Sequence, residues 1–116
     1  MHSLNLTDLG VREAGGLLAR GEVSSVELTR AALDRIAEVD ERTGAFVTVT
    51  EKLALEQARA ADARIAEGSA SSLTGVPMAL KDNMSTRGVA TTCSSRMLEG
   101  FVPTYDATVT RRLYSE

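Results

Sequence analysis

Apolar and polar positions alternate at helical spacing through most of the first two-thirds of the chain. The clearest stretch starts after Ser24, which is followed three positions later by Glu27, the spacing of a capping box. Gly44 breaks the pattern, so the sequence predicts a helix between Ser24 and Gly44. Its apolar stripe consists of Leu28, Ala32, Ile36 and Val39.

An earlier helix is predicted from a polar start to a glycine stop. Thr7-Asp8 can cap a helix running toward Arg20, with Gly21 placed to end it. Gly15-Gly16 lies in the interior of this segment and lowers its helix propensity by about 1 kcal/mol per glycine relative to alanine.

The region after Gly44 predicts a strand and then a third helix. Residues 45–50 are mostly β-branched or aromatic, which is typical of a short strand. Residues 51–67 are rich in alanine and return to helical spacing, with Gly68 as a stop. The small polar loop at 69–72 is the one predicted internal boundary.

The remainder of the chain has a different texture. Residues 76–80 are five consecutive apolar residues, as expected for a strand that is buried on both faces of a helix-covered sheet. Pro77 belongs near the start of that strand or at a sheet edge. Residues 84–105 show little periodicity, and Asp106 is predicted to cap a last helix that reaches Glu116. The predicted class is therefore α/β, mainly helical up to about residue 68, then a buried strand and a final helix.

Composition and charge narrow the class of protein further. The 116 residues are 43% hydrophobic and 25% charged, which is a globular balance. A net charge of -3 without a basic cluster argues against a nucleic-acid binder. A single cysteine excludes an internal disulfide, and no signal peptide or membrane-length apolar run is visible. These features predict a soluble cytoplasmic domain.

Lys81 is the leading candidate for chemistry because it directly follows the predicted buried strand. Functional groups of open α/β sheets gather at the carboxyl ends of the strands. Partial burial there would lower the pKa of the lysine and allow it to act as a base toward a serine. The alternative is a surface lysine whose ammonium group pairs with Asp82 or another carboxylate.

The hydroxyl-rich stretch 91–95 offers other candidates. Cys93 as a catalytic thiolate would need a histidine partner, and the only histidine is His2. The simpler interpretation is a loop whose hydroxyls satisfy backbone groups, just as Asp82-Asn83 can form an Asx turn. Metal ligands at useful spacing and glycine-rich phosphate loops are absent from the sequence.

Residues 73–84 (LTGVPMALKDNM) closely resemble the lysine motif of the amidase signature family. Residues 86–109 are similar to one branch of it, the A subunits of the glutamyl-tRNA(Gln)/aspartyl-tRNA(Asn) amidotransferases, and residues 21–29 are similar to the N-terminal helix junction of the family. The resemblance covers nearly the whole chain and implies a mixed β-sheet enclosed by helices. It also implies a Ser–cis-Ser–Lys triad in which Lys81 is the catalytic lysine.

The resemblance implies a reaction and partners. Lys81 would act through the middle serine to deprotonate the nucleophilic serine, which attacks the side-chain amide of glutamine and releases ammonia. A B subunit, using ATP and Mg²⁺, would pass this ammonia to glutamyl-tRNA(Gln), with aspartyl-tRNA(Asn) as a second candidate substrate. A small C subunit would brace the A and B subunits. No cofactor or metal is expected on this chain itself.

Both family serines lie downstream of the position that matches Glu116, and Ser94 and Ser95 do not match them. We therefore expect residues 1–116 to be the N-terminal portion of one amidase domain, with a helical layer at 1–68, a lysine-motif segment at 73–116 and the remainder absent. Alone, this portion is expected to be inactive. Two alternatives are a fragment of a tRNA-independent hydrolase of the same family and a non-catalytic interaction module.

Overall fold

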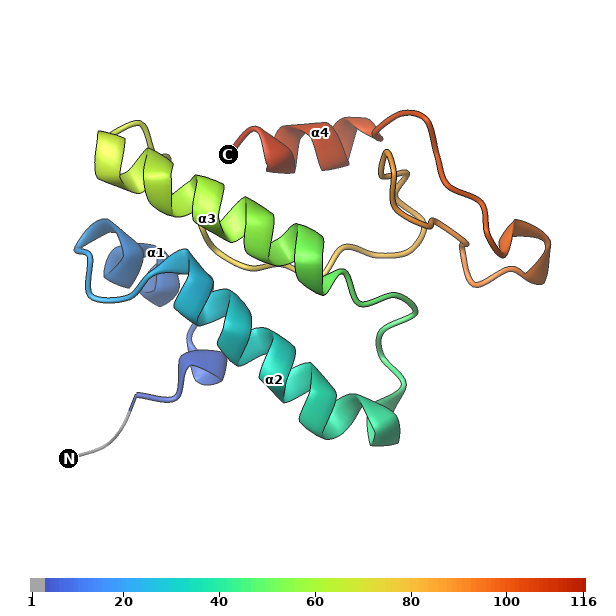
Figure 1. Cartoon of the computed structure of the whole chain (residues 1–116), viewed down its shortest axis with the longest axis horizontal. Coiled ribbons are helices and arrows are strands. Elements are labelled where there is room, and N and C mark those ends of the chain that lie inside the picture. Colours follow the sequence, from blue (N-terminus) through green and yellow to red (C-terminus); the bar gives the residue numbers. More distant parts are fainter. Residues whose placement is uncertain (1–3) are drawn as a thin grey trace. The chain divides into compact units, whose positions relative to one another are not determined.

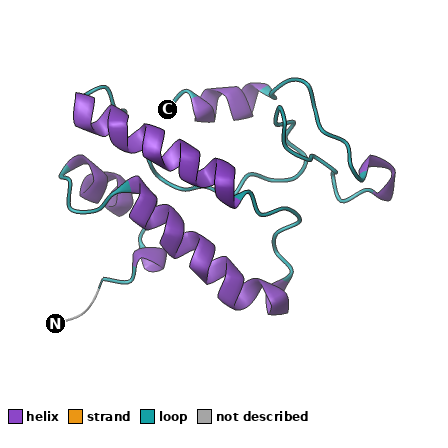
Figure 2. Ribbon diagram, viewed as in Figure 1, coloured by secondary structure: helices purple, strands orange, loops and turns teal. Residues whose placement is uncertain are grey.

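The computed structural model describes residues 4–116 and separates them into two compact units. The first unit extends through Pro77, and the second runs from Met78 to Glu116. Figure 1 follows the chain through both units, and Figure 2 shows the described residues as helices joined by loops and turns, without strands.

The first unit contains three α-helices and a short 3-10 helix. In chain order they are η1 (Leu6–Asp8), α1 (Val11–Ala19), α2 (Ser25–Thr43) and α3 (Glu51–Glu67). The two longer helices agree closely with the sequence prediction, and α3 ends at Gly68 as expected.

Local signals fix both ends of α2. The Ser24 hydroxyl accepts a hydrogen bond from the Glu27 amide at 3.0 Å, and the Glu27 carboxylate accepts one from the Ser24 amide at 2.8 Å. The predicted capping box is therefore confirmed. At the other end Gly44 has φ 60°, a left-handed conformation that glycine adopts without a Cβ penalty.

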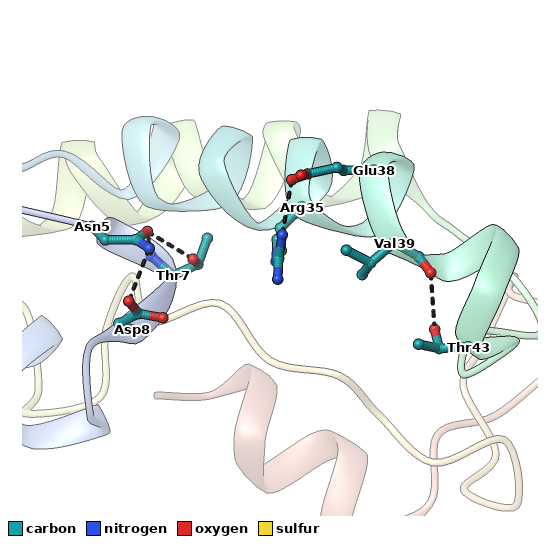
Figure 3. A network of polar contacts seen from close by, with 7 residues as sticks. All are labelled: Asn5, Thr7, Asp8, Arg35, Glu38, Val39 and Thr43. Carbon is teal, nitrogen blue, oxygen red and sulfur yellow. Dashed lines mark hydrogen bonds and ion pairs between the residues drawn. The ribbon is translucent and has the colours of Figure 1, made fainter.

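The predicted start of the first helix is wrong. Thr7 and Asp8 belong to η1, and α1 begins after Gly10. Asn5 explains this break, because its side chain caps η1: Oδ1 accepts from the Thr7 amide and hydroxyl, and Nδ2 donates to Asp8 at 2.9 Å. Figure 3 shows these side-chain contacts together with the exposed Arg35–Glu38 ion pair on α2.

An aliphatic core holds the first unit together. Ala14 and Leu18 of α1 pack with Val23 and Leu28, and Leu18 is only 2% exposed. Partly buried apolar side chains complete this core: Leu6, Leu9, Leu17, Ile65 and Val76. Burial of these side chains is the main stabilising term available to the unit.

Helix α3 also holds the N-terminus of α2. Asp62 on α3 accepts hydrogen bonds from the amides of Ser25 at 2.6 Å and Val26 at 3.2 Å. These are amides that the helix itself leaves unpaired, and a carboxylate at this end is favourable to the helix dipole. The sequence pattern did not predict this contact, because the two segments lie 36 to 37 residues apart.

Both predicted strands are wrong for the described residues. Residues 45–50 form a connection between α2 and α3, and residues 76–80 run without regular structure. Met78 is 48% exposed, so this apolar run is not buried on both faces. A strand needs a neighbouring strand to pair its amides and carbonyls, and the described chain supplies none.

The second unit is mostly loop. It contains the 3-10 helix η2 (Arg96–Leu98) and the helix α4 (Thr108–Tyr114). The predicted cap at Asp106 is wrong: Ala107 is the residue before α4, and the Asp106 carboxylate accepts from the Arg87 amide at 2.7 Å. The buried residues of this unit are not aliphatic: Thr86, Thr91, Thr92, Pro103 and Thr110.

Candidate functional site

Lys81 lies in the second unit, on the turn that follows residues 76–80. Its carbonyl accepts a hydrogen bond from the Met84 amide at 3.1 Å, which closes the turn. The residue is exposed, so the partial burial predicted for it is wrong. The physical reason is the missing strand, since no sheet within residues 4–116 covers this position.

The expected alternative of a Lys81–Asp82 ion pair is not found either. Ion pairs of the described chain join Arg20 to Glu22 and Arg35 to Glu38, both in the first unit. The Lys81 side chain projects without a hydrogen bond or ion pair to any residue from 4 to 116.

Asp82 instead accepts hydrogen bonds from a loop about ten residues further along the chain. Its Oδ1 accepts from the Thr92 amide at 2.9 Å, and its Oδ2 accepts from the Thr92 hydroxyl and, at 3.5 Å, from the Ser94 amide. The Asp82 carbonyl accepts from the Cys93 amide at 2.8 Å. Main chain and side chain of one residue thus fasten residues 92–94 beside Lys81.

These contacts change the acidity of Asp82. The Thr92 hydroxyl and then the Thr92 amide hold the pKa of Asp82 below its ordinary value, with a smaller contribution from the Ser94 amide. Partial burial of the carboxyl acts in the opposite direction. The group is therefore a carboxylate at neutral pH, which makes the hydrogen bonds to it charge-assisted.

The fastened loop has an unusual backbone. Cys93 has φ 50° and Ser94 has φ 56°, so two consecutive residues that are not glycine adopt the left-handed conformation. Cys93 is a free, exposed thiol, and His2, its only potential histidine partner, lies outside the described residues. A catalytic role for this cysteine gains no support from its surroundings.

Hydroxyl groups nearby pair with the backbone, as the simpler interpretation of the 91–95 stretch predicts. The Thr91 hydroxyl donates to the Val89 carbonyl at 3.2 Å and accepts from the Thr86 amide at 3.4 Å. The Asx turn predicted at Asp82-Asn83 is only partly right, because the turn is present but the Asp82 side chain reaches across to Thr92.

Of the predicted site residues, only Lys81 lies in the chain, and the structure shows no serine hydroxyl bonded to it among the described residues. The sequence pattern did not single out Asp82 as a functional residue. Its position next to the lysine was visible, but its partners are brought together only by the fold of residues 84–92.

Residues 4–116 offer little support for other kinds of site. No group of three or more histidine, cysteine, aspartate or glutamate side chains is placed to hold a metal ion there. A shallow hollow at the start of α3, lined by residues 49–53 and Leu55, lies in the unit that does not contain Lys81. None of the described helices is long and apolar enough to cross a membrane.

Comparison with protein-family models gives a match to the amidase model over residues 27–116, which include the Lys81 turn and the Asp82-fastened loop. The chain belongs to the amidase family.

Individual relatives give a finer comparison. The chain is 57% identical over 111 residues to a Myxococcus xanthus protein and 56% identical over 111 residues to one from Moorella thermoacetica. It is 50% identical over 113 residues to one from Caldanaerobacter subterraneus. All three are named as the A subunit of glutamyl-tRNA(Gln) amidotransferase. The matches cover 95 to 97% of this chain but 23% of each relative's length.

Proposed function

We propose that this chain is the lysine-bearing segment of a glutamine-hydrolysing A subunit of a tRNA-dependent amidotransferase. The observation that carries the proposal is the match itself. Relatives with that name are 50 to 57% identical over almost all of this chain, and the amidase family model spans Lys81.

The proposed role of Lys81 is that of the general base. As a neutral amine it would accept a proton from a middle serine, which in turn deprotonates the nucleophilic serine. That serine forms an acyl-enzyme with the side-chain carbonyl of glutamine, and ammonia leaves. The exposure of Lys81 and its lack of partners within residues 4–116 are compatible with serines supplied by residues outside the segment.

The remaining parts of the proposal concern the whole assembly. The segment would belong to an α/β domain in which helices enclose a mixed sheet, with strands from residues outside 4–116. B and C subunits would be partners in the cytoplasm, and the B subunit would use ATP and Mg²⁺ to amidate glutamyl-tRNA(Gln). Residues 1–116 alone would release no ammonia from glutamine, because they lack the nucleophile.

A chimeric protein tests the role of Lys81. Residues 1–116 would replace the matching N-terminal segment of the Moorella thermoacetica relative, and ammonia release from glutamine would be measured in complex with that organism's B and C subunits. Lys81→Ala should lower kcat by about 1,000-fold or more, because loss of one member of a nucleophile–base unit costs nearly the whole effect of that unit.

Lys52 provides the matched control, since it is the other lysine of the chain and is also exposed. Lys52→Ala should leave kcat within about twofold of the unmodified chimera, as for a surface change away from the site. Retention of activity by Lys81→Ala, or a folded chimera that is inactive before any substitution, would overturn the proposal. Lys81-dependent ammonia release by residues 1–116 alone would contradict the predicted inactivity.

A further inference from the structure

A carboxylate beside the proposed base has no assigned role in the reaction. Asp82 follows Lys81 directly in the chain, and it forms no ion pair with Lys81 or with any other cation among residues 4–116. Its hydrogen-bonding capacity is used on the main chain and hydroxyl of residues 92–94. Its function therefore has to be sought in that loop.

The loop adopts a backbone conformation that needs outside support. Two consecutive left-handed residues other than glycine, Cys93 and Ser94, are uncommon, and such residues persist only where their surroundings hold them. Asp82 accepts hydrogen bonds from the amides of Thr92, Cys93 and Ser94, which include both left-handed residues. One further contact, from the Ser94 amide to the Thr92 hydroxyl at 3.2 Å, lies inside the loop.

The same contacts also restrict the backbone at Lys81. Asp82 is fixed through its carbonyl, Oδ1 and Oδ2, so its backbone has little freedom to rotate. The neighbouring carbonyl of Lys81 is held by the Met84 amide. The Cα of Lys81 is thereby anchored on its C-terminal side, while its side chain stays free to reach a reacting group.

We propose that Asp82 is a positioning residue for the reaction, holding the left-handed 92–94 loop against the Lys81 turn and so fixing the point from which the lysine side chain reaches its serine. This inference rests on the proposed role of Lys81. Small displacements of a catalytic group cost large factors in rate, so this support should appear in kcat.

The test uses the chimeric complex with glutamine as substrate. Asp82→Ala should lower kcat by roughly 10- to 100-fold, because a displacement of about 1 Å can cost about 100-fold in rate, with KM within about threefold. Thr92→Val, which removes the hydroxyl donor and keeps the side-chain shape, should lower kcat in the same direction. Thr92→Ser, which retains the hydroxyl, should lie close to the unmodified chimera. In the double variant the two losses should not add, because both substitutions break one contact.

Two further variants separate positioning from general stability. Asp106 makes a similar carboxylate-to-amide contact in the same unit, with Arg87 at 2.7 Å, so Asp106→Ala should leave kcat within about threefold. Ser94→Gly, placed in the Asp82→Ala background, should recover part of the lost kcat, because glycine adopts the left-handed conformation without support.

The pH dependence distinguishes a third possibility, that Asp82 sets the basicity of Lys81 through its charge. Positioning predicts that the limb of the pH profile on which kcat falls with falling pH, where the neutral base is lost, is unchanged in Asp82→Asn, and a shift of that limb would overturn it. The positioning role would also be overturned if the Asp82→Ala and Thr92→Val variants both kept kcat within threefold of the unmodified chimera. Loss of activity in Lys81→Ala together with that result would leave the proposed function intact and reject only the role of Asp82.

Discussion

Both units bury threonines, but among the described residues only the first also buries leucine, valine and alanine. The first buries an aliphatic core around Leu18 and is built from helices whose ends are set by local signals. The second buries threonines and a proline, and it is held by hydrogen bonds between loops, with Asp82 and Thr92 at one of them. Apolar burial tolerates small shifts, whereas hydrogen bonds require defined directions. The unit that carries Lys81 is therefore the one whose geometry depends on polar contacts.

The largest expected effect on the free energy of unfolding comes from the aliphatic core of the first unit. Leu18→Ala should lower the free energy of unfolding of the first unit by about 2–5 kcal/mol, because it removes buried methyl groups and leaves a cavity. Urea unfolding followed by helical circular dichroism would measure it. Val11 on the same helix is 59% exposed, so Val11→Ala is the control and should change stability by less than about 0.5 kcal/mol. Equal effects of the two substitutions would contradict the assigned core.

A polar contact in the first unit gives the next effect. Asp62→Ala removes the acceptor for the Ser25 and Val26 amides at the start of α2, and should cost about 1–2 kcal/mol, as for loss of a helix cap. Asp34→Ala, at an exposed position on α2, is the control. If both variants unfold at the same urea concentration, the contact does not stabilise α2.

In the second unit, one substitution is expected to raise stability rather than lower it. Thr110 is 0% exposed, and its hydroxyl has no hydrogen-bond partner among the described residues. Thr110→Val keeps the shape and removes the unpaired group, so stability should rise by about 1 kcal/mol. A thermal melt compared with that of exposed Thr108→Val would measure the difference. A fall in stability would show that the Thr110 hydroxyl has a partner.

The smallest and most local expected effect is faster hydrogen exchange in the 92–94 loop at low pH. The pKa of Asp82 is lowered in the folded chain by the Thr92 hydroxyl and amide, so this contact stabilises the loop above the ordinary aspartate value of 3.8 and is lost as the pH falls below it. Hydrogen exchange at the Thr92 and Ser94 amides should therefore become faster on acidification through that range, beyond the intrinsic trend. Asp82→Asn should show no such extra dependence, and identical profiles would contradict the assignment.

The sequence predicted the two units unequally for the same physical reason. A helix pairs its own backbone groups within four residues, so Ser24, Glu27 and Gly44 placed both ends of α2, and helical spacing with Gly68 as a stop placed α3. A strand depends on partners elsewhere, and the apolar run at 76–80 had none among the described residues.

The candidate site shows the same limit. Lys81 was found from its motif, but its exposure could not be predicted from the apolar residues before it. The partners of Asp82 lie ten to twelve residues away and meet it only because residues 84–92 turn back. Hydroxyl-rich loops carry no periodicity, so no pattern reports which aspartate a threonine will reach.

The glycine pair of α1 has a consequence for protein engineering. A Cβ on Gly15 would lie 2.8 Å from the Ser72 carbonyl oxygen, whereas one on Gly16 would meet only the flexible end of Arg20. Replacement by alanine, a routine way to strengthen a helix, is therefore suited to Gly16 and unsuited to its neighbour. Two adjacent and chemically identical residues thus have different tolerance, because one of them gives the loop before the lysine motif its room.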